Sequence, residues 1–181
     1  MVKKLLLALL MLAPVSAMAQ KYGHFDYASI MQSMPEYKTA QTELESTYKK
    51  YQADLESMQK ELQTKAEKYQ KEDNDATPAN IKERHQQELQ DMYTKLQQAQ
   101  QDNSEDMQKQ QSQKMQPIAQ KVMNAVNSVA TEGGYVYVMD SNSAQSAGIF
   151  INPSLSADLT QAVCKKLGIT LSATSTSAGS K

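Results

Sequence analysis

The side chains that could support acid–base, metal or thiol chemistry are few in this sequence, and they lie far apart. His24 stands two residues before Asp26, a spacing that could form a metal-binding or acid–base pair on one side of a strand. His85 belongs to a different segment, and the single cysteine, Cys164, to a third. A zinc site needs three or four such ligands together, and this spacing does not indicate one. The simpler interpretation places His24 on the edge or face of a sheet, and His85 between two helices, where it would set their register.

Two further patterns approach known binding motifs without completing them. Asp73 and Asp75 resemble the start of a calcium loop, but the central glycine and the terminal glutamate are missing. The sequence has no glycine-rich phosphate loop. Cys164 fits a small buried hydrophobic residue, while a reactive thiol and a disulfide between two chains are the alternatives. We therefore predict that the protein is not an enzyme and that it uses no cofactor and no metal.

The stretch from Glu36 to Thr131 is the part of the chain that must organise the rest, because none of the six glycines falls within it. Apolar residues recur there at spacings of three and four, which places a narrow stripe along one side of a helix. The polar run Glu72–Thr77 interrupts the stripe. Thr77 suits an N-cap and Pro78 the first turn of a second helix. We predict a long antiparallel helical hairpin whose seam consists of Leu44, Tyr48, Tyr51, Leu55, Met58, Leu62, Tyr69, Ile81, His85, Leu89, Met92, Leu96 and Ala99.

Pro117 is the irregular position in the second helix. A proline inside a helix removes one backbone hydrogen bond and costs about 3 kcal/mol unless the helix bends. The composition also changes at this point, from a glutamine-rich stretch at 97–116 to the apolar Ile118, Val122 and Val126. We predict a hinge at Pro117, with the helical hairpin arm at 36–116 and the packed root of the second helix after it.

The first nineteen residues have the pattern of a secretory signal peptide. Lys3 and Lys4 precede an apolar run, and a small-residue cleavage pattern ends at Ala19. The apolar run is much shorter than the roughly 20 residues that span a bilayer. We therefore predict a mature chain that begins at Gln20 and is soluble in an envelope compartment, which the family resemblance described below makes the periplasm. Its net charge, 17 basic residues against 20 acidic ones, gives no support for nucleic-acid binding.

The two ends of the mature chain, 20–35 and 117–171, are predicted to form one β/α body. Strands are expected at Lys21–Asp26, Tyr135–Met139 and Gly148–Ile151, with a helical turn at Tyr27–Met34 and a polar loop at Asp140–Ser146. Ser154 or Ser156 would cap a last helix that reaches Leu167 and stops at Gly168. The Ser/Thr-rich tail at 172–181 is predicted to be disordered.

Three short strands cannot bury a sheet face within one chain, so we predict that the body packs against copies of itself. The residues that we expect at this interface are Phe25, Tyr135, Val136, Tyr137, Val138, Ile149 and Ile151. A purely structural coiled-coil protein of the envelope is the alternative, but it would not explain the strand-forming ends.

The order of local sequences resembles one known family over nearly the whole mature chain. The residues that carry the likeness are Tyr22–Asp26 with Ile30 and Pro35, Met115–Ile118 with Val122, Ala125 and Val129, Gly134–Asp140, and Ile149–Leu155 with Asp158–Thr160. In this order around a glycine-free hairpin, they resemble the Skp/OmpH family of periplasmic chaperones. The resemblance implies a homotrimer with a small β-barrel body and three hairpin arms around a cavity. It also implies ATP-independent holding of unfolded outer-membrane proteins.

The charge of the arm differs from that of the basic arms in the family. Residues 60–91 carry six Lys or Arg against eight acidic residues, so the resemblance transfers neither a lipopolysaccharide-binding patch nor strong electrostatic steering. Contacts with client proteins are instead expected from adaptable Met and Tyr side chains. The candidate client-binding residues are Tyr69, Tyr93, Met107, Met115 and Met123, for which packing in the seam of the hairpin is the alternative role.

Overall fold

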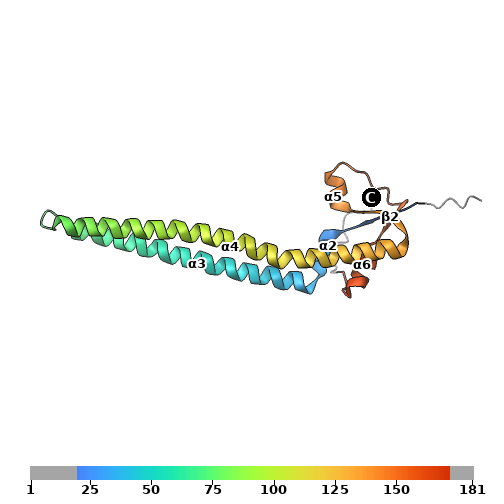
Figure 1. Ribbon diagram of the computed structural model, residues 1–181, viewed down its shortest axis with the longest axis horizontal. Coiled ribbons are helices and arrows are strands. Elements are labelled where there is room, and N and C mark those ends of the chain that lie inside the picture. Colours follow the sequence, from blue (N-terminus) through green and yellow to red (C-terminus); the bar gives the residue numbers. More distant parts are fainter. Residues whose placement is uncertain (1–19, 172–181) are drawn as a thin grey trace, which may run out of the picture. The chain divides into compact units, whose positions relative to one another are not determined.

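The computed structural model describes residues 20–171, so the predicted signal peptide at 1–19 and the predicted disordered tail at 172–181 lie outside the described residues. The chain is mainly helical with a small β part, as the sequence predicts (Figure 1). The strands are β1 (Lys21–Phe25), β2 (Tyr135–Asp140) and β3 (Ser156–Asp158), and the helices are α2 (Tyr27–Ser33), α3 (Pro35–Glu72), α4 (Ala79–Gly133), α5 (Ser141–Ser146) and α6 (Thr160–Leu167). Among the described residues, no helix combines the length and apolar character that crossing a membrane requires.

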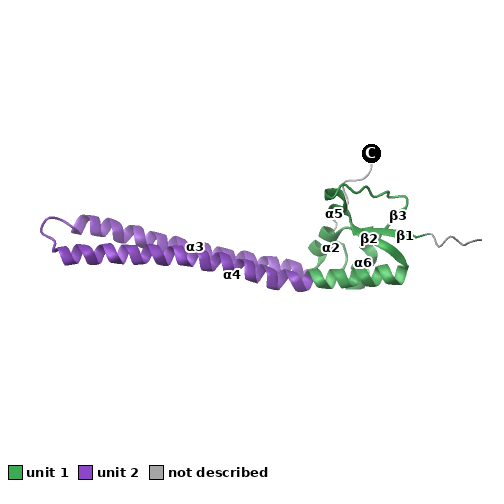
Figure 2. Cartoon of the chain, turned by 45° about the horizontal axis from the view of Figure 1, so that its top comes forward, with its two compact units in different colours: residues 1–34, 119–181 green, residues 35–118 purple. Residues whose placement is uncertain are grey.

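The chain divides into two compact units (Figure 2). Unit 2 is Pro35–Ile118 and contains α3 with the first part of α4. Unit 1 takes the remaining residues on both sides and holds the three strands and the short helices. The division falls between Ile118 and Ala119, next to Pro117, although α4 is helical on both sides of the proline.

Unit 2 is an antiparallel hairpin whose seam is half-buried along its length. Cross-hairpin pairs fix the register: Lys114 Nζ lies 2.5 Å from Glu43 Oε2, and the Tyr51 hydroxyl donates to Asp106 at 2.5 Å. One seam prediction is wrong, because Tyr48 is 52% exposed while its neighbour Thr47 is half-buried. Tyr48 was predicted to lie in the seam because its side chain is more apolar than that of Thr47. A seam residue at either position satisfies the spacing of three and four between Leu44 and Tyr51.

The turn between α3 and α4 is closed by side chains of its own residues. Asn74 Oδ1 accepts the backbone N–H of Ala76 at 2.9 Å, which is an Asx turn. The Thr77 hydroxyl donates to Glu72 O at 2.9 Å and accepts the Asn74 N–H at 3.1 Å. The prediction that Thr77 caps α4 is therefore wrong, since its hydroxyl closes the turn and α4 begins at Ala79.

Unit 1 contains a three-stranded sheet with the order β2-β1-β3. Both neighbours of β1 run parallel to it, with Tyr22 opposite Tyr137 on one side and opposite Ser156 on the other. The predicted strand at Gly148–Ile151 is absent from this sheet, and the third strand is β3 instead. The apolar type of residues 149–151 suggested a strand, but the parallel pairing with β1 is made by the polar residues 156–158.

Two helix boundaries in unit 1 also differ from the sequence predictions. The expected loop at Asp140–Ser146 contains α5, because Asp140 caps it by accepting the Ser143 N–H at 2.9 Å. The last helix, α6, begins at Thr160, so neither Ser154 nor Ser156 caps it. Gly168 ends α6 as predicted, with φ +70°, a left-handed conformation that glycine adopts without strain.

The core of unit 1 is built from β1, α2, the root of α4 and α6. The buried side of β1 carries Phe25, and Ile30 and Met34 come from α2 and its end. Burial of each large apolar side chain contributes about 1.5–3 kcal/mol to folding. The root of α4 after Pro117, which the sequence predicts to be packed, contributes the buried side chains of Val122, Ala125 and Val126. Helix α6 contributes those of Val163 and Cys164.

Candidate functional site

The side chains that could carry chemistry in unit 1 have structural roles. His24 Nδ1 lies 2.9 Å from Ser156 Oγ, across β1 and β3. Asp26 caps α2 by accepting the Ser29 N–H at 2.9 Å and the Ser29 hydroxyl at 2.6 Å. His24 therefore lies on the sheet, as the simpler interpretation expected. Across residues 20–171, the structure shows no group of three or more His, Cys, Asp or Glu side chains that could hold a metal ion.

Cys164 is buried in α6, and burial raises the pKa of its thiol. A raised pKa lowers the fraction of thiolate, which is the reactive form. Burial also keeps the sulfur from reaching a second chain. The structure thus places Cys164 where the small buried hydrophobic residue was expected.

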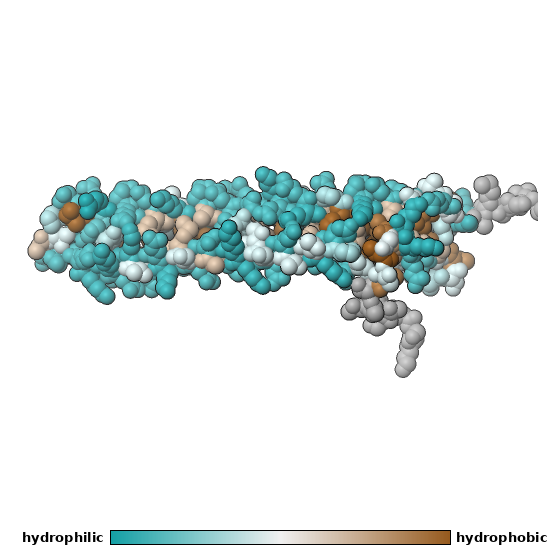
Figure 3. All heavy atoms as spheres, turned by 90° about the horizontal axis from the view of Figure 1, so that it is seen from below, coloured by the Kyte–Doolittle hydropathy of each residue, from teal (hydrophilic) through white to brown (hydrophobic). Residues whose placement is uncertain are grey.

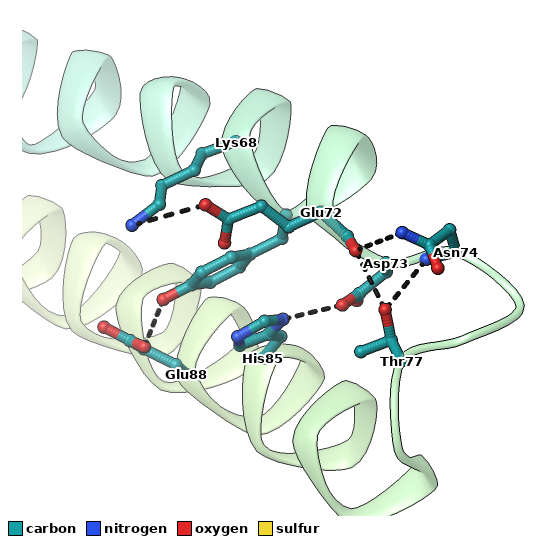
Figure 4. Close-up of polar contacts among 8 residues, drawn as sticks. Lys68, Glu72, Asp73, Asn74, Thr77, His85 and Glu88 are labelled. Atoms are coloured by element: carbon teal, nitrogen blue, oxygen red, sulfur yellow. Dashed lines mark hydrogen bonds and ion pairs between the residues drawn. The ribbon is translucent and has the colours of Figure 1, made fainter.

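The tip of the hairpin holds a compact polar cluster (Figure 4). The rings of Tyr69 and His85 stack with their centroids 3.8 Å apart, and His85 Nδ1 lies 2.9 Å from Asp73 Oδ1. The Tyr69 hydroxyl donates to Glu88, which also pairs with Lys65 across the hairpin. The cluster joins α3, the turn and α4, so His85 does occupy the position between two helices that the sequence predicts.

Hydrogen bonds and charges at the tip shift the pKa values of Glu88 and Tyr69. The hydrogen bond from Lys65, followed by the one from Tyr69, holds the pKa of Glu88 below its usual value. The same bond to Glu88 raises the pKa of Tyr69. Tyr69 therefore remains a neutral donor and Glu88 an ionised acceptor at neutral pH.

Tyr69 cannot serve as a client-binding residue in this conformation, which corrects its inclusion among the candidates. Only 9% of Tyr69 is exposed, and both its ring and its hydroxyl are occupied within the hairpin. The alternative role in the seam is the one that the structure shows. Sequence spacing alone already placed Tyr69 on the apolar stripe.

A second polar cluster lies in the seam further along the hairpin. Asp106 accepts the hydroxyl of Tyr51 and the side-chain amide of Gln110, both at 2.5 Å. These two bonds, Tyr51 first, lower the pKa of Asp106, and Asp106 raises the pKa of Tyr51. Sequence reasoning missed this cluster because an acidic residue at a seam position looks like part of a solvated face.

The other four client-binding candidates are spread along α4 and over both units. Tyr93 is 49% exposed, and its hydroxyl accepts the side-chain amide of Gln97 at 3.0 Å. Met107 and Met115 are half-buried in unit 2, whereas Met123 is exposed in unit 1. In the face shown in Figure 3, most of the hairpin surface is hydrophilic, and the larger group of hydrophobic side chains lies over unit 1. The hairpin thus offers apolar side chains that are scattered along α4.

The open face of the sheet in unit 1 carries several of the large exposed apolar residues. Tyr22 and Tyr137 lie parallel, with ring centroids 6.3 Å apart. The segment from Ile149 to Leu155 runs beside them and encloses a pocket of about 300 Å³. No charged side chain is among the residues that line this pocket. An uncharged apolar pocket of this kind suits contact with another protein surface.

The predicted interface residues divide into three groups. Phe25 is only 3% exposed and belongs to the core of the single chain, so it cannot provide interface surface, and its inclusion is corrected. Tyr135, Val138 and Ile151 are half-buried. Surface is offered by Val136, Tyr137 and Ile149.

Sequence reasoning missed Phe150 and Leu155, which are 86% and 77% exposed. The signal for Phe150 was present, because it stands between two isoleucines that were expected at the interface. Leu155 stands between Ser154 and Ser156, the two residues predicted as caps of the last helix, and was not among the residues expected at the interface.

Comparisons with known proteins found a matching family model and a solved structure of similar fold. The family model described as "Outer membrane protein (OmpH-like)" matches residues 21–167. A crystal structure of an OmpH-like candidate outer membrane chaperone from Caulobacter crescentus is similar in fold, with a TM-score of 0.66 and 16% sequence identity. The match covers 82% of this chain and 83% of the other. A search of curated proteins finds no match.

Proposed function

We propose a holdase function for this chain, starting from the fact that it belongs to the OmpH-like family of outer membrane proteins. In this proposal the protein binds unfolded outer-membrane proteins in the periplasm and prevents their aggregation. The observation that carries it is the long hairpin with a narrow, half-buried and partly polar seam. The description of the Caulobacter crescentus structure as a candidate outer membrane chaperone supports it as well.

The proposed holding surface consists of many weak contacts. Strands of an unfolded β-barrel protein alternate apolar and polar residues, so each segment presents a modest apolar face. Exposed or half-buried side chains such as Tyr93, Met107 and Met115 can cover such faces. Each contact contributes from a fraction of a kcal/mol to a few kcal/mol. Binding of this kind is broad in sequence and reversible without nucleotide.

The proposed assembly is a homotrimer held together by the bodies, with the hairpin arms enclosing a cavity for the client. The open apolar face of unit 1, with Tyr22, Tyr137 and Phe150, supports association because it is large, exposed and uncharged. Three arms around one client would multiply weak contacts through effective concentration. The trimeric state and the cavity between the arms are both part of what we propose.

A structural coiled-coil protein of the envelope without chaperone activity is the second candidate. The mainly hydrophilic surface of the hairpin in Figure 3 favours it. The two functions differ in one measurable respect, since a spacer has no affinity for unfolded chains.

The deciding experiment dilutes a urea-unfolded β-barrel protein into buffer and records light scattering with and without the mature chain. We expect suppression of scattering at a small molar excess of trimer, without nucleotide or metal. A disulfide-free coiled-coil protein of similar length and charge serves as the matched control. Equal scattering in the presence of this chain and of the control would overturn the holdase proposal and leave the spacer function.

A further inference from the structure

A glutamine stands at the position where the predicted cleavage after Ala19 leaves a new N-terminus. Gln20 is exposed and directly precedes β1. At the end of a chain, a glutamine carries a free α-amine and a side-chain amide on one residue, so the amine nitrogen can attack Cδ and close a lactam ring. Inside a chain the same nitrogen belongs to a peptide bond, whose resonance makes it a poor nucleophile. Cleavage after Ala19 would therefore create a reactive end.

The side chain of Gln20 contacts a hydrogen-bond donor from β1. Because side chains two residues apart in an extended chain point to the same side, Tyr22 can reach the residue that precedes the strand. The Tyr22 hydroxyl donates to Gln20 Oε1 at 2.7 Å. The Tyr22 ring also lies parallel to the ring of Tyr137, which restricts where the hydroxyl can lie. The oxygen that gains negative charge when Cδ is attacked thus already accepts a hydrogen bond.

We propose that the mature chain is modified at its own N-terminus, where Gln20 cyclises to pyroglutamate and the Tyr22 hydroxyl stabilises the developing oxyanion. The α-nitrogen forms a bond to Cδ, and negative charge moves to Oε1, which accepts the Tyr22 hydrogen bond. Return of this charge breaks the bond between Cδ and Nε2, and Nε2 leaves as ammonia after taking a proton from the α-nitrogen. The balance includes no oxidant, reductant or cofactor. The inference rests on the predicted cleavage after Ala19 and is independent of the holdase function.

Cyclisation removes the positive charge that cleavage leaves at the start of β1. The α-amines of peptides have a pKa of about 8, so most uncyclised ends are charged at neutral pH, and only the neutral amine attacks Cδ. Tyr22 also lines the apolar pocket of unit 1, whose lining side chains are uncharged. An ammonium group beside this pocket would lose water whenever another protein surface covered it, which is unfavourable. The lactam removes that cost at the end of the chain.

Intact-mass spectrometry tests the modification on protein isolated from the periplasm of bacteria that make the full chain. The expected mass is that of residues 20–181 less one ammonia, with the loss located at Gln20 by fragmentation. Gln20→Ala is the matched control and should show the full mass of its own mature chain, because its other Asn and Gln residues are unchanged. The full mass of residues 20–181 in the unchanged protein, or a chain that begins at another residue, would overturn the proposal.

The rate of ammonia release from purified protein tests the contribution of Tyr22. A protease that cuts a tagged precursor directly before Gln20 frees the amine, and cyclisation is then followed in buffer at about pH 8. Tyr22→Phe keeps the ring and removes the hydroxyl, so the mature chain should cyclise about threefold or more slowly. Tyr137→Phe changes the other ring of the stack and should leave the rate unchanged.

Unfolding the same proteins separates the fold from the chemistry of glutamine itself. In concentrated urea the position of Tyr22 is lost, and the unchanged chain and Tyr22→Phe should cyclise at equal rates. Equal rates in the folded proteins, or faster cyclisation of Tyr22→Phe, would overturn the stabilisation by Tyr22. Suppression of light scattering, measured on the cyclised protein with an unfolded barrel protein, reports separately whether the holdase function fails.

Discussion

Tyr69 and His85 stack face to face across the hairpin, with their rings 3.8 Å apart and inclined by only 2°. The stack joins α3 to α4 near the turn, where the helices would otherwise fray. The outer edge of each ring reaches an acidic partner, Glu88 for the tyrosine and Asp73 for the histidine. The tip is therefore fastened by a polar and aromatic cluster, in which the sequence predicted the seam positions of Tyr69 and His85 but not their acidic partners.

Replacing Tyr69 tests whether this cluster fastens the tip. Tyr69→Ala should increase the exchange rate of backbone amides between Lys65 and Glu88 by about tenfold or more, because the stack and the bond to Glu88 are both lost. Tyr69→Phe should have an intermediate effect, since the stack remains. Tyr93→Ala is the control on an exposed tyrosine. Equal exchange in Tyr69→Ala and the control would show that the stack does not stabilise the tip.

The two seam carboxylates should make hairpin stability depend on pH. The pKa values of Glu88 and Asp106 are lowered in the folded chain, mainly by bonds from Lys65 and from Tyr51. Their contribution is therefore complete above the ordinary carboxyl pKa of about 4, and it is lost as the pH falls through the lowered values. Thermal melts followed by circular dichroism between pH 7 and pH 2.5 should show this loss. In the double variant Glu88→Gln, Asp106→Asn, the loss of thermal stability between pH 7 and pH 2.5 should be smaller than in the unchanged protein. An equal loss in both proteins would contradict the assignment of the pH dependence to these two carboxylates.

Asp140 links three elements of unit 1 through one carboxylate. It caps α5 through Ser143 and accepts the N–H of Tyr27, at the start of α2, at 3.0 Å. Partial burial acts to raise its pKa, but the bonds from Ser143, Tyr27 and Asn142 outweigh burial and lower the pKa. Asp140→Ala should destabilise unit 1 by about 1–2 kcal/mol, the typical cost of a lost cap. Urea unfolding measures this cost, and Asp158→Ala, which removes two bonds that both come from Thr160, offers the comparison.

The sequence predicted the elements that depend on periodicity and missed those that depend on local side-chain bonds. The hairpin follows from the spacing of Leu44, Leu55 and Leu62, which no tertiary contact has to override. Helix α5 escaped notice because six residues carry no periodic signal, and only the cap at Asp140 marks its start. The apolar residues 149–151 were predicted to form a strand of the sheet, whereas the strand that pairs with β1 at that edge is β3. The clusters at Tyr69 and Asp106 need knowledge of which residues meet across the hairpin.

Pro117 is the proposed hinge between the arm and the body. Pro117→Ala would restore a backbone donor and allow α4 to stiffen. Spin labels on exposed residues of the tip should then show a narrower distribution of distances between the arms of the assembled protein. The double variant Pro117→Ala, Ala119→Pro, which moves the proline by two positions, should keep the distribution broad. If Pro117→Ala leaves the breadth of the distribution unchanged, the hinge lies elsewhere in the arm.

The last prediction concerns the arm as the holding surface. Residues 60–91 form the outer part of the hairpin, and removing them with a short glycine turn in their place shortens α3 and α4 without touching unit 1. We expect this deletion to reduce suppression of aggregation several-fold for a large unfolded barrel protein and much less for a small one, because a shorter cage encloses less chain. Single changes such as Tyr93→Ala or Met107→Ala should reduce it by less than about twofold, since each contact is weak.

Varying the salt concentration in the same aggregation assay tests whether charges hold the client. The near balance of six basic and eight acidic residues in 60–91 predicts that holding changes little between about 50 and 500 mM salt, a range over which the screening of exposed charges increases strongly. A strong decrease with salt would instead indicate electrostatic capture of the client. Should the shortened protein hold a large barrel protein as well as the intact chain does, the outer arm is not the holding surface, and the exposed apolar residues of unit 1 become the next candidates for client contact.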